Sequence, residues 1–382
     1  MKTLKVLPAL LASLFYIADI NAHTPPDEIP DLRKFSEQVA DNEEFPTLFN
    51  EQPLEVIDMH LHPGSFDKLG PKGKAFVLNV FPLDLPDVIK IPLIRFFSSF
   101  QLNPYGAFIG IKNECRRAGV SHCFLYATYA PETWGIEPNE DLIGYLNDDR
   151  NQVNGKSFFY GLASISVANW ADSKTANLDN LKTALDNPNV VGIKLAFAHT
   201  LTPFDDSRYY DIYQLAKETQ KPIYHHVGTS PLRRVSEFDE DELPFVLRTF
   251  DPSYLEEAIK MFPTVKFVMG HAGNDANQEG YSKIDEVFAL AEKYSNVYIE
   301  ISALGSSRSD PTGEVLDGIF QRARNANLID RIIYGSDGPG NPGNTDNYKK
   351  RVLESLTRVE YSHQDAQKVM AGNVRSVFNL PN

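Results

Sequence analysis

From residue 55 to the C-terminus, short apolar runs alternate with stretches in which apolar residues recur at helical spacing. The runs are rich in Val, Ile, Phe and Tyr, as expected for strands buried on both faces. Regular alternation of this kind is typical of parallel βαβ units. Eight strands are predicted, at residues 55–60, 122–127, 158–165, 190–196, 222–227, 265–271, 296–302 and 331–337. Helices are predicted at 141–151, 177–186, 206–219, 252–261, 283–294 and 313–324.

Eight such units favour a closed (β/α)8 TIM barrel of the α/β class over an open doubly wound sheet. An open sheet would predict a glycine-rich dinucleotide fingerprint after the first strand, and the sequence has none there. Two segments, residues 63 to about 104 and residues 229–249, are too long to be simple loops. Both follow carboxyl ends of strands, where barrel active sites lie, so we expect lid insertions after strands 1 and 5.

The composition fits one decorated globular domain. The chain has 382 residues, of which 42% are hydrophobic and 23% charged, so a large core can be buried. Its formal net charge of −14 argues against nucleic acid as a partner, because phosphate backbones are bound by clustered Lys and Arg.

The N-terminus has the pattern of a secretory signal. Lys2 and Lys5 precede an apolar run at residues 6–17, and Ala22 offers a cleavage site. The run is shorter than a membrane span, and no other segment could span a bilayer. We therefore predict a signal peptide at residues 1–22, a leader at 23–54 and the barrel at 55–382, in a periplasmic or secreted protein. Export would permit a disulfide between the only two cysteines, Cys115 and Cys123, and two buried thiols are the alternative.

The first predicted strand ends in a pair of histidines. His60 and His62 are two residues apart and therefore point to the same side of a strand. Two neutral imidazoles suit zinc and leave room for another histidine, a carboxylate and a water. Other chemistry-bearing residues stand at later strand ends: Lys194, His226, His271 and Asp337.

This pattern resembles the amidohydrolase superfamily, specifically its amidohydrolase-related branch, which includes the amino-carboxymuconate-semialdehyde decarboxylase type. The resemblance runs from about Glu55 to the C-terminus and includes the segments 251–257 and 368–373. It implies a divalent ion held by His60, His62, His226 and Asp337. It also implies an acid/base or electrostatic role for His271, and dimers are common among such enzymes.

Several residues leave alternatives open. His225 is expected to face the helices as a hydrogen-bonded core residue, because adjacent strand residues point to opposite sides. Lys194 is either a carboxylated bridge between two ions or an ammonium that orients an acidic substrate. Glu300 is expected to pair with Lys194 or to support the site from behind. His122, His199 and His363 match no motif and are expected to be structural or solvated.

Four further residues are candidates to contact a substrate. Ser302 is expected to point into the pocket. Trp134 is a candidate to stack on a substrate ring, and a packing anchor for its loop is the simpler interpretation. Arg233 and Arg234 are candidates to hold a substrate carboxylate, although solvated arginines are the simpler interpretation.

The favoured reaction is hydrolysis of a small-molecule amide, lactone or ester. A water activated by the ion gives its proton to Asp337, and His271 helps to stabilise the developing oxyanion. The first alternative is non-oxidative decarboxylation of an aromatic or unsaturated carboxylic acid. The second is a non-catalytic, metal-stabilised envelope binding protein, whose ion would have no free coordination position. One zinc ion is expected, with Mn2+, Fe2+ or Co2+ as alternatives and two ions if Lys194 is carboxylated.

Overall fold

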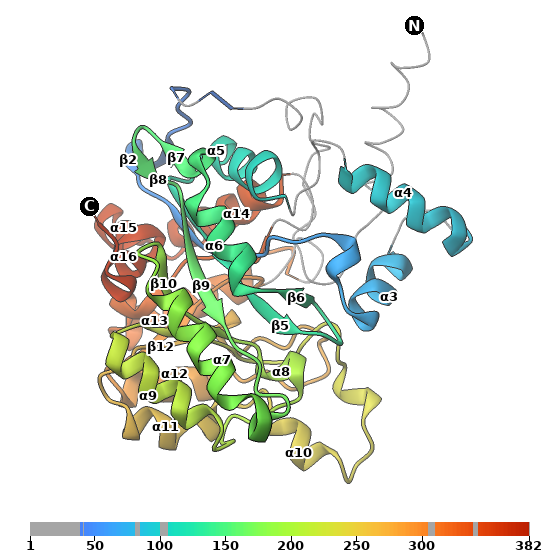
Figure 1. The fold of residues 1–382 in the computed structure, drawn as a ribbon. Coiled ribbons are helices and arrows are strands. Elements are labelled where there is room, and N and C mark those ends of the chain that lie inside the picture. The colour runs from blue at the N-terminus through green and yellow to red at the C-terminus, as the bar shows by residue number, and fades with distance from the viewer. Residues whose placement is uncertain are drawn as a thin grey trace, which may run out of the picture.

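A parallel β-barrel forms the centre of the protein. The computed structural model describes residues 39–40, 42–80, 85–99, 106–304, 310–338 and 343–381. The eight-stranded sheet has the order β14-β13-β12-β11-β10-β9-β4-β3, and neighbouring strands within it run parallel. Its strands are β3 (Ile57–Leu61), β4 (His122–Tyr126), β9 (Phe159–Ser164), β10 (Val190–Leu195), β11 (Ile223–His226), β12 (Phe267–Gly270), β13 (Val297–Glu300) and β14 (Ile332–Ile333) (Figure 1). Each lies within, or one residue beyond, a predicted strand, so the TIM-barrel prediction is confirmed.

The two ends of the sheet meet between β3 and the segment after β14. Leu61 and Gly338 form a parallel bridge, and the His62 amide donates to the Gly338 carbonyl at 3.1 Å. Because β14 is only two residues long, this seam depends on the loop that follows it. The loop carries Asp337, so barrel closure and site assembly use the same backbone.

Most of the helices surround the barrel on its outer side (Figure 1). The helices of the described residues are α3 (Pro71–Val80), α4 (Asp87–Ser99), α5 (Asn113–Arg117), α6 (Asn139–Asn147), α7 (Trp170–Leu185), α8 (Phe197–Thr200), α9 (Tyr209–Thr219), α10 (Leu243–Leu247), α11 (Glu256–Met261), α12 (Ile284–Lys293), α13 (Glu314–Asn325), α14 (Asn344–Arg358), α15 (His363–Gln367) and α16 (Asn373–Phe378). Short 3-10 and π-helical turns include η2 (Phe66–Lys68), η3 (Ala107–Lys112), η5 (Val235–Glu237), η6 (Pro252–Leu255) and η7 (His271–Gly273). Asp251 caps η6 by accepting from the Ser253 amide, and Pro252 occupies the first turn.

The helix predictions were correct in place but not always in length. Helix α7 begins at Trp170, seven residues before the predicted start, because Asn169 adopts a left-handed conformation that ends the preceding loop. Three short antiparallel hairpins were not predicted: β1 (Thr47–Phe49) with β2 (Gln52–Leu54), β5 (Thr128–Ala130) with β6 (Gly135–Glu137), and β7 (Gln152–Val153) with β8 (Lys156–Ser157).

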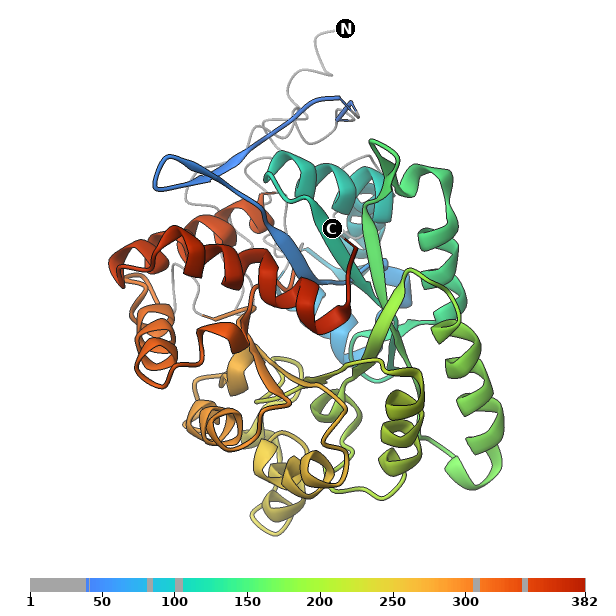
Figure 2. The same cartoon turned by 90° about the vertical axis from the view of Figure 1, so that its left-hand side faces the viewer.

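The core has two layers. An outer layer packs the helices against the sheet, and an inner layer fills the barrel with residues such as Met59, Tyr126 and Tyr224. Helix α16 closes the amino-terminal end, where the Phe378 ring lies 5.0 Å from the Phe124 ring (Figure 2). Helix α16 therefore leaves the opposite, carboxyl-terminal end of the barrel uncovered.

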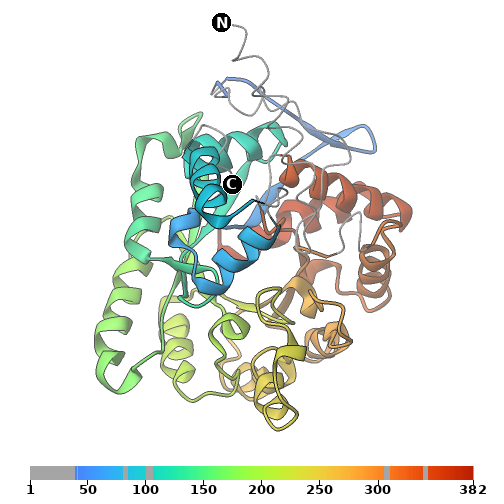
Figure 3. The same cartoon turned by 90° about the vertical axis from the view of Figure 1, so that its right-hand side faces the viewer.

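The predicted insertions lie at this carboxyl-terminal end. Helices α3 and α4 belong to the first and stand in front of the strands in Figure 3; η5 and α10 belong to the second. Lys72 on α3 donates to Glu237 on η5 at 2.6 Å, which ties the two insertions together. Their role as lids stays a prediction.

The predicted signal peptide and the leader up to residue 38 lie outside the described residues. Within the described parts of the chain, no helix is both long and apolar enough to span a bilayer. Cys115 and Cys123 are both buried free thiols.

Candidate metal centre

Three side-chain atoms from opposite sides of the barrel seam converge at its carboxyl-terminal end. His60 Nε2 lies 3.0 Å from His62 Nε2, and Asp337 Oδ1 lies 3.2 Å and 3.3 Å from these two nitrogens. Ligands held at about 2.0–2.1 Å in a tetrahedron are roughly 3.4 Å apart. The three atoms therefore have a spacing that one divalent ion accommodates.

A bulge in β3 directs His60 to this point. The pairing of β3 with β4 shifts by one residue between Asp58 and Leu61, and bulges re-aim side chains in this way. As a result Met59 belongs to the inner core, and the ring of its neighbour His60 also contacts the inner residue Tyr126. Simple alternation would have placed one of these two residues outside.

Hydroxyl groups set the orientation of the His60 ring. The Tyr224 and Ser302 hydroxyls both donate to Glu300 Oε2, at 3.1 Å and 2.9 Å. Their oxygens are then acceptors for His60 Nδ1–H, at 3.0 Å and 2.9 Å. His60 Nε2 consequently presents its lone pair to the centre, as a metal ligand requires.

His271 and His226 form a second pair beside the first. His271 Nδ1 lies 3.0 Å from Ser302 Oγ, and its Nε2 lies 3.0 Å from His226 Nδ1. His226 Nε2 is buried and has no hydrogen-bond partner, so a lone pair is available there for an ion. His60, His271 and Asp337 also have ligand atoms within 4.8 Å of one another, so His271 belongs to the same centre and His226 lies beside it.

Burial keeps the histidines neutral. It holds the pKa values of His60 and His226 well below the usual value, and neighbouring cationic groups lower them further. Burial likewise lowers the pKa of His271 to about 4. Neutral imidazoles are the form that binds metal, so the electrostatics of the site favour ligation.

Glu300 supports the site from behind. Besides the two hydroxyls, it accepts from the amides of His271 (3.0 Å) and Ser302 (2.9 Å). Burial raises the pKa of Glu300 to about 7. Glu300 makes no ion pair with Lys194 among the described residues, so the supporting role is the one observed.

Lys194 is buried beside His60. Its Nζ lies 3.2 Å from His60 Nε2 and 4.4 Å and 4.5 Å from the ring centres of Tyr126 and Tyr224. Burial lowers the pKa of Lys194 to about 7, against the attraction of Asp337 and Glu300. Two aromatic faces stabilise a cation, so the Lys194 amine is held beside His60 by the rings of Tyr126 and Tyr224.

Backbone strain coincides with two of these residues. His271 and Asp337 adopt left-handed conformations, with φ of 58° and 59°. For residues other than glycine this costs on the order of 1–3 kcal/mol and is concentrated at functional sites. The strain is consistent with a backbone held in place for the sake of these side chains.

His199 was expected to be structural or solvated, and the structure places it in the wall of the site. Its ring lies 4.4 Å from that of His226. Trp134 Nε1 donates to His199 Nε2 at 3.2 Å, and Ser230 Oγ lies 2.9 Å from Nδ1. His199 follows a strand by only a few residues, and this position was the signal that could have identified it. His122 and His363 lie away from the site, where their rings contact the main-chain carbonyls of Ser157 and Pro53.

The other residues singled out from the sequence lie at different distances from the centre. Ser302 is fully buried between His60 and His271. Arg233 is half-buried, and its Nε donates to the His199 carbonyl at 3.1 Å, whereas Arg234 is exposed. His225 faces away from the centre, stacked between Phe197 and Phe267. Contrary to expectation, neither of its ring nitrogens has a hydrogen-bond partner.

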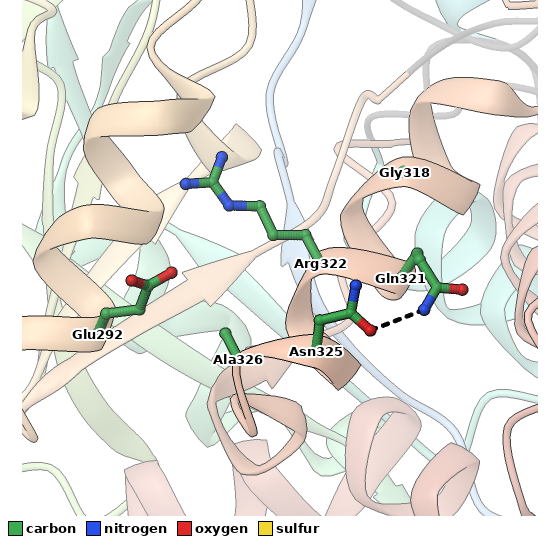
Figure 4. A pocket seen from close by; sticks show the side chains of 6 residues that line it. All are labelled: Glu292, Gly318, Gln321, Arg322, Asn325 and Ala326. Atoms are coloured by element: carbon green, nitrogen blue, oxygen red, sulfur yellow. Dashed lines mark hydrogen bonds between the residues drawn. The ribbon is translucent and has the colours of Figure 1, made fainter.

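An outer groove of about 590 Å³ between α12 and α13 is not part of this centre. It is lined by Glu292, Gly318, Gln321, Arg322, Asn325 and Ala326 (Figure 4). Arg322 is already paired with Asp285, and Gln321 donates to Asn325 at 3.0 Å. None of the site residues described above lines it.

Comparison with solved structures supports the same fold. An uncharacterised TIM-barrel protein from Bordetella bronchiseptica is 17% identical, with a TM-score of 0.55, over 85% of this chain and 99% of that one. A 5-carboxyvanillate decarboxylase from Novosphingobium aromaticivorans, solved with manganese, is 16% identical with a TM-score of 0.51, over 90% and 100%. A probable 2-pyrone-4,6-dicarboxylic acid hydrolase from Acinetobacter baumannii is 13% identical with a TM-score of 0.51, over 86% and 100%.

Sequence comparison identifies the family. A search of curated proteins gives no match. The family model described as Amidohydrolase (Amidohydro_2) matches residues 164–380, more than half of the chain, and this span contains His226, His271 and Asp337. The chain therefore belongs to the Amidohydrolase family, whose members are metal-dependent enzymes.

Proposed function

We propose that the protein is a metal-dependent hydrolase of a small-molecule amide, lactone or ester. The observation that carries this proposal is the convergence of His60, His62 and Asp337 within 3.0–3.3 Å of one another. The side chains of His62 and Asp337 are 27% and 18% exposed, so the centre is reachable by a substrate. A closed structural site would need no such access.

In this proposal His60, His62, His226 and Asp337 hold the ion. When bound, the ion supplies an activated water and polarises the substrate carbonyl. Zinc agrees best with three imidazoles and one carboxylate, and manganese, iron and cobalt are the alternatives. The manganese in the 5-carboxyvanillate decarboxylase structure supports including manganese in any test.

The protein's own residues move the protons. Asp337 accepts the proton of the attacking water at its partly exposed carboxylate and returns it to the leaving group. His271 is connected through the Ser302 hydroxyl to the buried Glu300 carboxylate. Because burial keeps His271 neutral at rest, we assign it an electrostatic role, in which its neutral imidazole beside the centre would stabilise the developing oxyanion.

Non-oxidative decarboxylation is the second candidate. Arg233 is half-buried at the wall of the site, and Lys194 is a buried amine 3.2 Å from His60. Either group would hold a substrate carboxylate. In that reaction His271 would protonate the carbon from which carbon dioxide leaves.

One assay separates the two reactions. Apo protein is reloaded with zinc or manganese and offered a panel of lactones, esters, amides and aromatic carboxylic acids, while proton release and carbon dioxide are both followed. Hydrolysis that Asp337→Asn abolishes supports the proposal. Carbon dioxide release in place of acid formation establishes the alternative. A fully loaded protein with no turnover on any class favours the non-catalytic binding protein.

Metal content tests the number of ions. Elemental mass spectrometry near one ion per chain is expected, and a value near two that falls to one in Lys194→Ala would identify a carboxylated bridge. We also propose export, which N-terminal sequencing of protein from the producing cell tests. A mature chain beginning at His23 is expected.

A further inference from the structure

His199 lies where both insertions meet the wall of the metal centre. It belongs to α8, which follows β10 and lies beside the β5–β6 hairpin (Figure 1). The centroid of its ring is 4.4 Å from that of the His226 ring, and only 4% of the residue is exposed. The ring can therefore act on the centre in two ways, as a ligand or through His226.

Hydrogen bonds occupy both ring nitrogens of His199. The Trp134 indole is a donor only, and its Nε1 lies 3.2 Å from His199 Nε2, so Nε2 accepts. The ring proton is then on Nδ1, which donates to Ser230 Oγ at 2.9 Å. The same oxygen also accepts from the Leu232 amide at 3.1 Å. His199 has no lone pair left for an ion, so it is not a ligand.

Both insertions hold His199 in place. Phe76 on α3, in the first insertion, contacts the Trp134 ring edge-to-face, with the two centroids 6.4 Å apart. The second insertion supplies Ser230 and also Arg233, whose Nε donates to the His199 carbonyl at 3.1 Å. The orientation of the His199 ring therefore depends on how the two insertions are seated.

His226 needs such support because hydrogen bonding leaves one of its nitrogens unheld. Rotation of a histidine ring about its Cβ–Cγ bond has a broad energy minimum. Nδ1 of His226 lies 3.0 Å from His271 Nε2, but Nε2 has no hydrogen-bond partner. A metal ligand has to be held within about 10–20° of its productive direction. The His199 ring, inclined at 58° to that of His226, blocks the tilting of the ligand.

We propose that His199 is a positioning residue that fixes the metal ligand His226, and that Trp134 holds His199 in the required orientation. The inference rests on the proposed metal centre and extends it to residues that do not contact the ion. Through the hydrogen bond from Trp134 to His199, the seating of the first insertion affects the ligands of the ion.

Metal affinity tests the proposal on the full chain. The dissociation constant for zinc is measured by competition with a chromogenic chelator. His199→Ala should raise this constant roughly 10–100-fold, and Trp134→Phe, which loses one neutral hydrogen bond, should raise it roughly two- to tenfold. Trp170→Phe is the matched control, because Trp170 begins α7 and packs on the outer layer of the core. Its dissociation constant should equal that of the wild type.

A double variant separates positioning from a general loss of packing. Because Trp134 acts through His199, Trp134→Phe/His199→Ala should bind zinc as tightly as His199→Ala alone. Independent damage at the two positions would instead multiply the two effects, and that result would overturn the proposal. An unchanged dissociation constant in His199→Ala would overturn it as well.

An NMR signature detects the same connection in the wild-type protein, whatever the stability of the variants. The chain has two tryptophans, so isotopic labelling of the indole nitrogens gives two N–H signals. The Trp134 signal, assigned by its loss in Trp134→Phe, should move when zinc is added, and the Trp170 signal should not. If zinc binds while the Trp134 signal stays in place, the positioning role is wrong and the proposed metal centre stands. If no zinc binds, the proposed function fails together with this inference.

Discussion

Gly335 leads into the loop that carries Asp337, and replacing it with alanine should disrupt the centre without removing any ligand. A Cβ at this position would lie 2.3 Å from Glu300 Oε1 and 2.9 Å from His60 Cβ. Ordinary contacts are about 3.4–4 Å, so either the carboxylate or the His60 backbone must move by roughly 1 Å.

The expected loss of stability follows from the hydrogen bonds that hold the Glu300 carboxylate. Its carboxylate accepts hydrogen bonds from two amides and two hydroxyls. Overpacking typically costs about 1–3 kcal/mol, and one weakened hydrogen bond to a buried charged group adds about 1.5–3 kcal/mol. We expect Gly335→Ala to lower the free energy of unfolding by about 3–5 kcal/mol and to weaken metal binding.

Urea unfolding of the metal-free protein measures the first effect, and metal titration the second. Gly144→Ala is the matched control. A Cβ there meets nothing within 4 Å, and Gly144 lies inside α6, so alanine should stabilise the protein by about 0.5–1 kcal/mol. If Gly335→Ala unfolds within about 0.5 kcal/mol of the wild type, the tight packing inferred around Glu300 is wrong.

Four further substitutions test the site and the rest of the barrel. His226→Ala should lower metal content and activity together, whereas His271→Ala should keep the metal and lose turnover; loss of metal from both would make His271 a ligand. Ser302→Ala removes a hydroxyl that orients the rings of His60 and His271, and metal affinity should fall roughly 10–100-fold, as competition with a chelator would show. Burial raises the pKa of Glu114 to about 7, so the folded state holds this proton more tightly than the unfolded chain. The proton's contribution to stability, about 3 kcal/mol, is complete below about pH 4.5 and is lost as the pH rises to 7. In Glu114→Gln the free energy of unfolding, measured in urea, should lack this fall with pH. If the wild type and Glu114→Gln have the same pH dependence, the assignment is wrong.

The site was only partly predictable because its support comes from residues without a motif. In the sequence Tyr224 is one more aromatic residue of an apolar strand, yet in the structure its hydroxyl connects His60 with Glu300. Gly270 lies opposite it because a Cβ there would be 1.9 Å from the hydroxyl oxygen. These relations join residues 60, 224, 270 and 300, and no local pattern encodes them.

The sequence by itself determined the eight strands, because continuous apolar runs separated by helical periodicity have few other solutions. It also determined which residues stand at strand ends, and hence that His60, His62, His226, His271 and Asp337 would gather at one end of a barrel. Only the tertiary structure decided how they meet. The extra residue in β3 turns His60 inward beside Met59, and the fold brings His199 against His226. Bulges and contacts between distant segments depend on the packing of the whole barrel, whereas strand formation depends on residues that are neighbours in the chain.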